Sequence, residues 1–279
     1  MNSRDPEELR RLALSLRSSL EEDRFWGLPP LAEKKTERVP APRPKTTPSV
    51  AQAAPSPASR PEKTHTLFEA PAPPPAAKLS REERTRRLEE IASEVRACKK
   101  CRLCETRTNA VPGEGNPETR ILFIGEGPGA TEDEIGRPFV GRAGQLLTDI
   151  IEKGMRLPRG ETYITNIVKC RPPENREPAP DEILACMPYL RRQIEILSPE
   201  IIMPLGRPAT SALLETQESM SRLRGRVHRK EGRKFIPTFH PAYLLRNPPE
   251  KKKTWEDVQL VMRELDLPPA PLQGPAGSP

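Results

Sequence analysis

The hydrophobic pattern predicts alternating strands and helices in the part of the chain after residue 80. Four short runs of apolar and β-branched residues each predict a buried strand. These runs span residues 120–126, 162–170, 200–206 and 234–241. Apolar residues spaced three or four apart predict helices at residues 143–154, 181–197, 207–216 and 255–266. The alternation indicates an α/β fold with a parallel sheet covered on both faces, whose ligands bind at the carboxyl ends of the strands.

The first 79 residues have a different pattern. Leucines recur at helical spacing from Leu9 to Leu20 among Glu and Arg, so an amphipathic helix is predicted within residues 1–26. Residues 27–79 are rich in Pro, Ala, Ser and Thr, in a chain of 279 residues that has 36 prolines. Because such a composition buries little apolar surface, this segment is predicted to be a disordered linker.

A folded domain is predicted to begin at Ser80. Ser80 and Glu83 fit a capping box, and the charged segment 81–97 that follows them predicts a helix. The predicted domain covers residues 80–268, and the Pro- and Gly-rich residues 269–279 are predicted to form a disordered tail.

Charge and composition narrow the class of protein. The chain has 46 Lys and Arg against 39 Asp and Glu, a net charge of +7, which suits a polyanionic partner as well as an ordinary basic protein. It has no apolar run of about 18 residues, and arginines interrupt the only apolar stretch near its start. A cytoplasmic protein with no membrane contact is therefore expected, in which cysteines serve as ligands more readily than as disulfides.

The five cysteines have a spacing that is typical of a metal or cluster site. Cys98, Cys101 and Cys104 lie within seven residues, Cys170 ends the second predicted strand, and Cys186 lies in the helix that follows. Zinc and a four-iron cluster both fit this donor set, and the spacing alone does not choose four ligands among five. The alternative is that these cysteines are free and simply buried.

The first predicted strand ends in a glycine-rich turn. Gly125, Gly127 and Ala130 satisfy the G-x-G-x-x-A pattern of dinucleotide-binding folds. However, Pro128 and the acidic and GRPFVG segments that precede the next predicted helix argue against that interpretation, because a dinucleotide turn leads directly into a helix.

Three polar side chains lie at the ends of predicted strands. Glu126 follows the first strand, Asn166 lies in the second and His240 ends the fourth. Because parallel strands end at one edge of the sheet, we expect a carboxylate, an amide and an imidazole to converge there. The alternative for Asn166 is a hydrogen-bonded amide of the core.

Four motifs together resemble the family 4 uracil-DNA glycosylases, the iron–sulfur branch of that superfamily. They are a CxxC pair with two later cysteines, GEGPGATEDEIGRPFVGRAGQLL, TNIVKCRPPENREP and FHPAYLLRNP, in the family's order from about Cys98 to Trp255. The resemblance implies a monomeric, monofunctional enzyme that flips uracil out of single- or double-stranded DNA and hydrolyses its N-glycosidic bond, leaving an abasic site for base excision repair. It also implies a three-layer α/β sandwich with a central four-stranded parallel sheet.

The resemblance assigns roles to residues of this chain. Phe139 would stack on uracil, although it also fits an ordinary core position. Asn166 would contact the edge of the base, and His240 would lie near its O2. Gly125 and Gly127 would line the pocket that holds the base, and Glu126 would orient the water or shape this pocket.

The resemblance also implies how DNA and a cofactor are held. Leu244, Leu245 and Arg246 resemble a loop that enters the minor groove, although they also fit the first turn of a helix. Basic residues are expected to face the phosphates, although solvated charge is the ordinary interpretation. These are Lys169, Arg171, Arg176 and Lys251–Lys253.

The ligands implied for one 4Fe-4S cluster are four of the five cysteines, with Cys104 left over. They are Cys98, Cys101, Cys170 and Cys186. No nucleotide or magnesium is expected. The region CRPPENREPAPDE lacks the basic, histidine-containing insert of relatives that capture uracil covalently, so turnover is predicted.

Other functions remain open at this point. One is a zinc-stabilised module that binds nucleic acid without catalysis, and another is an iron–sulfur electron carrier. The N-terminal helix is predicted to dock on a replication or repair protein. Leu67-Phe68 is a second docking candidate, since it resembles the short peptides that bind bacterial sliding clamps.

Overall fold

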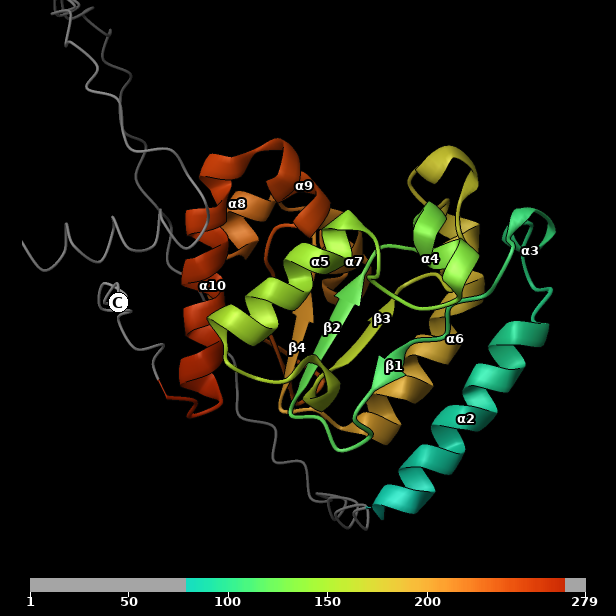
Figure 1. Ribbon diagram of the computed structural model, residues 1–279, viewed down its shortest axis with the longest axis horizontal. Helices are drawn as coiled ribbons and strands as arrows, with labels where there is room; N and C mark the ends of the chain where they lie inside the picture. The colour runs from blue at the N-terminus through green and yellow to red at the C-terminus, as the bar shows by residue number, and fades with distance from the viewer. Residues whose placement is uncertain (1–78, 269–279) are drawn as a thin grey trace, which may run out of the picture. The chain divides into compact units, whose positions relative to one another are not determined.

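The computed structural model describes residues 79–268 (Figure 1). The predicted N-terminal helix, almost all of the predicted linker and the predicted tail lie outside the described residues. None of the helices between residues 79 and 268 has both the length and the apolar character needed to cross a lipid bilayer.

The described chain forms one mixed sheet of six strands. The strands are β1 (Glu114–Gly115), β2 (Ile121–Gly125), β3 (Tyr163–Asn166), β4 (Ile201–Pro204), β5 (His228–Lys230) and β6 (Arg233–Phe235). Their order across the sheet is β1-β3-β2-β4-β6-β5. The inner pairs are parallel, whereas β1 and β5 pair antiparallel at the two edges.

The prediction of a central four-stranded parallel sheet is corrected to a mixed sheet of six strands, because β1 and β5 add an antiparallel strand at each edge. β1 has two residues and β5 has three, and both are polar and at least partly exposed. Strands this short show no alternation of apolar and polar positions, so the hydrophobic pattern did not predict them.

Helices connect the strands. The longer ones are α2 (Arg81–Ala97), α5 (Arg142–Asp149), α6 (Pro180–Leu197), α7 (Arg207–Leu214) and α10 (Lys251–Glu264). The short ones are α3 (Leu103–Thr106), α4 (Ala130–Ile135), α8 (Met220–Leu223) and α9 (Pro241–Arg246). The remaining turns are η1 (Ile150–Gly154), η2 (Arg159–Glu161), η3 (Pro173–Asn175) and η4 (Pro248–Glu250).

The sequence explains where α2 begins. The Ser80 hydroxyl accepts a hydrogen bond of 3.2 Å from the backbone N–H of Glu83, as the capping pattern predicted. By contrast, the acidic segment after the glycine-rich turn forms the short helix α4, where no helix was predicted.

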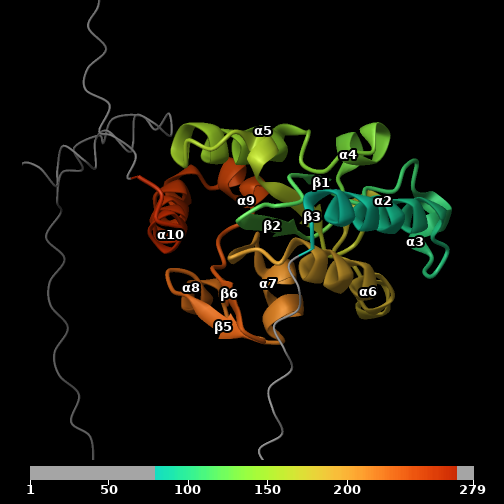
Figure 2. The ribbon, with the colours of Figure 1, turned by 90° about the horizontal axis from the view of Figure 1, so that it is seen from below.

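Two apolar cores lie on opposite faces of the sheet, so the fold has three layers. In β2, Leu122 and Ile124 belong to a core with residues of α2, α6 and α7, whereas Ile121 and Phe123 belong to a core with residues of α5, α9 and α10. Figure 2 shows these two groups of helices on the two sides of the strands. Because the inner strands are buried on both faces, they read as continuous apolar runs in the sequence.

The parallel register brings the ends of distant segments to one edge of the sheet. Gly125, the last residue of β2, pairs with Asn166, the last residue of β3. Beyond β4, the N–H of Gly206 donates to the carbonyl of Thr238, two residues before His240. Glu126 directly follows β2, Asn166 ends β3 and His240 precedes α9, so all three predicted polar groups lie at this edge.

Candidate functional site

A glycine, an amide and an aromatic ring lie in contact at the end of β2. A Cβ added to Gly125 would lie 2.5 Å from Cζ of Phe139 and still closer to Oδ1 of Asn166. The Gly125 backbone is thus packed between the two side chains. The sequence prediction placed these three residues together, and the structure brings them together.

Asn166 is buried without a complete set of hydrogen bonds. Its side chain is 1% exposed, and its Oδ1 has no hydrogen-bond partner among residues 79–268. A buried acceptor left unpaired costs about 1–3 kcal/mol, so such groups are rare unless a ligand satisfies them. The position of this unpaired oxygen at the carboxyl edge of the sheet indicates a binding site there.

Phe139 holds an unusual backbone conformation. Its φ is +51°, in the left-handed region that a bulky residue rarely adopts, and its ring is buried. Gly144 of α5 lies directly against the Phe139 carbonyl, where an added Cβ would overlap the backbone. The loop is therefore held in a strained conformation by close packing.

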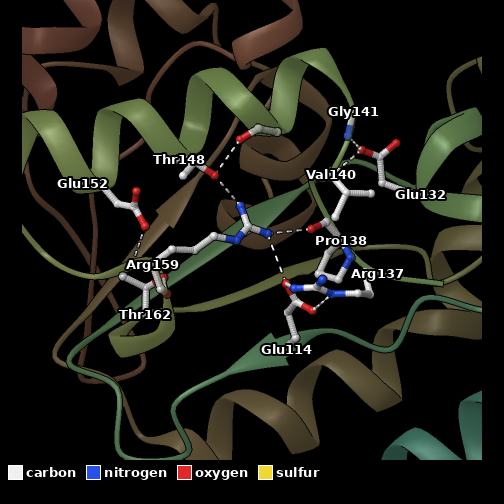
Figure 3. A network of polar contacts seen from close by, with 11 residues as sticks. Glu114, Glu132, Arg137, Pro138, Val140, Gly141, Thr148, Glu152, Arg159 and Thr162 are labelled. Carbon is white, nitrogen blue, oxygen red and sulfur yellow. Dashed lines mark hydrogen bonds and ion pairs between the residues drawn. The ribbon is translucent and has the colours of Figure 1, made fainter. Parts of the chain in front are cut away.

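Hydrogen bonds on both sides of Phe139 stabilise this conformation (Figure 3). Before it, Nη2 of Arg159 donates to the Pro138 carbonyl at 2.8 Å. After it, one carboxylate oxygen of Glu132 accepts from the N–H of Val140 at 2.9 Å and of Gly141 at 2.8 Å. We call these two sets of contacts the loop clamp.

Arg159 is itself fixed by neighbours. Its Nη1 donates to Oγ1 of Thr148 at 2.9 Å, and its Nη2 lies 3.2 Å from Glu114, which also pairs with Arg137 (Figure 3). Neither Glu132 nor Arg159 was predicted from the sequence. Glu132 lay within a recognised motif, but Arg159 is 20 residues along the chain from Phe139 and belongs to no motif.

His240 stands beside Phe139 at the start of α9. The two ring centroids are 5.7 Å apart with an interplanar angle of 34°. Nδ1 of His240 accepts a 3.1 Å hydrogen bond from the N–H of Ala242, which caps the helix. Burial lowers the pKa of His240 to about 4, so the ring is neutral at pH 7 and its proton is on Nε2.

Glu126 is a second titratable group at this edge. Burial raises its pKa to about 7, and the nearby Glu177 carboxylate adds to the effect. Its side chain is partly exposed, and its backbone carbonyl accepts from the N–H of Val168 at 3.1 Å. Glu126 therefore exchanges protons near neutral pH, as a group in general acid–base chemistry does.

Gly127 allows the glycine-rich turn to approach the segment that follows β3. A Cβ at Gly127 would lie 2.9 Å from Cγ2 of Val168 and 3.5 Å from Cδ of Pro172. The turn and this segment are thus close neighbours at the carboxyl edge of the sheet.

The predicted DNA-binding residues are placed differently from one another. Leu244 is 0% exposed and belongs to the apolar core, so it has a packing role in place of the predicted DNA contact. Leu245 and Arg246 of α9 are exposed. The alternative interpretation of this segment as a helical turn is correct for its backbone, because α9 spans Pro241–Arg246.

Basic residues that were predicted to face phosphates have protein partners, Lys169 and Arg176 among them. Lys169 is 1% exposed, and burial lowers its pKa to about 8. Arg176 forms an ion pair of 2.7 Å with Glu182, a carboxylate that is fully buried. The prediction is wrong for Lys169, since charged residues are assigned to the surface by default and the sequence does not reveal its internal acceptors.

All five cysteines line one cavity between α2, α3, α6 and the end of β3, together with Arg107, Lys169 and Tyr189. Nη1 of Arg107 donates to Sγ of Cys170 at 2.9 Å. Within residues 79–268, no three side chains of the metal-binding types stand close enough to one another to hold an ion in this conformation. The donor set nonetheless fits a group with thiolate ligands, because five thiols surround a single space.

The cysteine segment is tied to the β3–α6 connection through Glu182. Its carboxylate accepts from Arg102 at 2.8 Å, from Arg176 and from the backbone N–H of Ala179. Arg176 is the largest of the influences that lower the pKa of Glu182 to about 2. Arg102 lies next to Cys101, so its ion pair with the buried Glu182 carboxylate connects the first cysteines to the helix that carries Cys186.

The family model and three relatives that this chain matches are uracil-DNA glycosylases. Residues 112–259 match the model of the uracil DNA glycosylase superfamily. The chain is 50% identical to the Type-4 uracil-DNA glycosylase of Saccharolobus solfataricus over 193 residues, which are 66% of this chain and 89% of that protein. It is 53% identical to the Type-4 uracil-DNA glycosylase of Thermotoga maritima over 164 residues, 57% of this chain and 84% of that protein. A Type-5 uracil-DNA glycosylase of Thermus thermophilus is 37% identical over 119 residues, 37% of this chain and 53% of that protein.

Proposed function

Since this chain belongs to the uracil-DNA glycosylase superfamily, we propose that it removes uracil from DNA by hydrolysing the N-glycosidic bond and leaves an abasic site for repair. One observation of the site carries this proposal. The buried Asn166 has an unpaired Oδ1 and lies against the same glycine as the Phe139 ring, which in turn lies beside His240.

Asn166 is proposed to read the edge of the base. Its Oδ1 would accept from N3–H of uracil while its amide group donates to O4. Cytosine presents the opposite pattern at these two atoms and would leave buried polar groups unpaired. A site built on such hydrogen bonds discriminates by orders of magnitude.

Phe139 is proposed to stack on the flipped base. A glycosylase must take its target out of the helix, and an aromatic ring offsets part of the lost base stacking. The loop clamp fixes the ring position before the base arrives, so little ordering is left for the binding step.

His240 is proposed to stabilise the leaving group. As the bond to C1′ breaks, uracil departs with the bonding electron pair and negative charge accumulates on O2. The neutral ring can donate Nε2–H to that oxygen, because Nδ1 is already engaged as an acceptor. A donor held ready for developing charge is the main electrostatic contribution to catalysis.

Glu126 is proposed to orient the attacking water. Water adds to C1′ and loses a proton, which the Glu126 carboxylate can accept in its ionised form. With a pKa of about 7, this group is close to half ionised at neutral pH.

Four thiolates are proposed to hold one 4Fe-4S cluster, with Cys104 as the remaining thiol of the cavity. The proposed ligands are Cys98, Cys101, Cys170 and Cys186. Soft sulfur donors around one space suit iron–sulfur binding. The cluster would supply folding energy by joining α2, the end of β3 and α6, and none of the steps above depends on electron transfer.

Leu245 and Arg246 are proposed to contact DNA. Both are exposed in α9, which begins at His240. An apolar side chain can fill the space that the flipped base leaves, and arginine is attracted to the minor groove.

The experiment is uracil release by the purified full chain. Single- and double-stranded oligonucleotides with one uracil are compared with the same sequences carrying cytosine or thymine at that position. We expect free uracil and an alkali-sensitive site only from the uracil substrates. DNA binding without release from an iron-loaded protein would instead support a nucleic-acid-binding module.

A further inference from the structure

Lys169 is a buried cation for which the mechanism above has no role. Its Nζ donates three hydrogen bonds, to Oγ1 of Thr165 at 2.6 Å, to the backbone carbonyl of Asn166 at 2.8 Å and to Oε1 of Gln193 at 2.7 Å. These bonds use all three protons of the ammonium group. The side chain is therefore fixed in one position.

The acceptors around Lys169 are themselves fixed. Oγ1 of Thr165 and Nε2 of Gln193 both donate to the carbonyl of Pro112, at 2.9 and 2.8 Å. The Gln193 amide can satisfy Pro112 and Lys169 together in only one orientation. The ammonium group and its neighbours thus form a saturated network that holds the last two residues of β3, Thr165 and Asn166.

All three acceptors of Lys169 are neutral. Between residues 79 and 268, no carboxylate forms an ion pair with Nζ, and the ionisable group whose charge acts on the ammonium is the thiol of Cys186. An uncompensated buried charge is costly, so buried cations are nearly always paired with an anion. A counter-charge is therefore expected close to Lys169.

The cysteine cavity lies where that counter-charge is needed. Lys169 lines the cavity, its backbone N–H donates to Sγ of Cys186 at 3.3 Å, and the next residue is Cys170. Arg107 provides a second cation against Cys170. Four thiolates around a zinc ion or an oxidised four-iron core carry roughly two net negative charges, which would balance these two cations.

We propose that Lys169 is a positioning residue that pairs electrostatically with the anionic metal–thiolate group and, through the same ammonium, fixes the main chain of Asn166. Loading of the metal group is thereby coupled to recognition of the base. The electrostatic pairing rests on the proposed iron–sulfur cluster, and the coupling to base recognition rests on the proposed removal of uracil.

The test compares Lys169→Met with wild type, with Lys153→Met as the matched control. Met keeps much of the side-chain volume and removes the charge and its hydrogen bonds, whereas Lys153 is an exposed lysine of η1 paired with Asp149. The electrostatic pairing is tested by the iron content and by the rate at which absorbance at about 400 nm bleaches in air. We expect bleaching at least about 5-fold faster in Lys169→Met and unchanged in Lys153→Met. An unchanged rate and iron content in both variants would overturn the electrostatic pairing.

The claim that Lys169 positions Asn166 is tested by a double-mutant cycle with Asn166→Ala. Lys169→Met is expected to lower single-turnover uracil release about 10-fold or more with DNA affinity preserved, but to cause no further loss when Asn166 is already Ala. Lys169→Met is expected to speed bleaching equally whether residue 166 is Asn or Ala. Independent, multiplicative losses would show that Lys169 does not act through Asn166.

Thr165→Val tests the positioning role of Lys169 in a second way, which remains available if Lys169→Met does not fold. This isosteric change removes one acceptor of Nζ and leaves Pro112 bonded to Gln193. We expect a roughly 3- to 10-fold slower release with normal iron content, and an unaltered rate would refute the positioning role. Absence of uracil release from wild type would contradict the proposed function, whereas the bleaching comparison would still decide the pairing.

Discussion

The close packing around Gly125 gives a quantitative prediction for Gly125→Ala. This glycine has no positive φ, so its backbone accepts alanine and only the added methyl group matters. That methyl would lie 2.5 Å from Cζ of Phe139, whereas ordinary contact begins at 3.4 Å. The Phe139 ring must move by about 0.9 Å, and the Asn166 amide must move slightly more.

A displacement of this size affects activity more than stability. Misplacing groups at a reacting centre by about 1 Å lowers the rate about 100-fold. Overpacking by one methyl group costs about 1–3 kcal/mol of the free energy of unfolding, which a folded domain usually survives. Gly125→Ala should therefore release uracil about 100-fold more slowly while remaining folded.

The assay is single-turnover uracil release with enzyme in excess, alongside a thermal melt. Gly160→Ala is the matched control, because an added Cβ at that exposed glycine has nothing within 4 Å. It should behave as wild type in both measurements. A rate for Gly125→Ala within about 3-fold of wild type would show that uracil does not bind between Phe139 and Asn166.

Three further predictions concern the neighbours of this site. Glu132→Ala should slow uracil release about 10-fold or more, because the N–H groups of Val140 and Gly141 lose their acceptor. Glu132→Gln should restore most of the rate, because a single oxygen accepts both bonds. Failure of the Gln variant to restore the rate would mean that the charge of Glu132 matters more than the loop clamp. Burial raises the pKa of Glu126 to about 7, so the rate of uracil release should rise with pH through about 7 and then level off. Glu126→Gln should give a lower rate that does not change with pH. An unchanged pH profile in this variant would assign the ionisation to another group. The pKa of His240 is lowered from 6.5 to about 4, so its neutral form contributes stability that is complete above pH 6.5 and lost as the pH falls from 6.5 towards 4. In urea melts, His240→Gln should therefore lose less stability than wild type over that interval. Parallel stability curves for the two proteins would contradict the assignment.

Patterns of apolar residues predicted the inner part of this fold well. The strands buried on both faces read as continuous apolar runs, and the parallel connections then required Gly125, Asn166 and His240 to share one edge. The edge strands β1 and β5 were not predicted, because their two or three polar residues pair without burying an apolar face.

Polar contacts between distant segments were the part that the sequence did not reveal. Arg159 contributes to the loop clamp from beyond the end of α5, and nothing local distinguishes it from a surface arginine. Lys169 was expected at the surface, yet its three acceptors come from β3 and from α6. Such residues are identified by their partners, which only the folded arrangement brings together.

The most direct test of the account is Asn166→Ala, measured for uracil release and for DNA affinity on the same oligonucleotide. If Asn166, with its unpaired Oδ1, reads the base, release falls by about 1,000-fold or more while affinity for DNA without uracil stays within about 3-fold of wild type. Retained release, or an equal fall in release and in affinity for DNA without uracil, would contradict the assignment of this site.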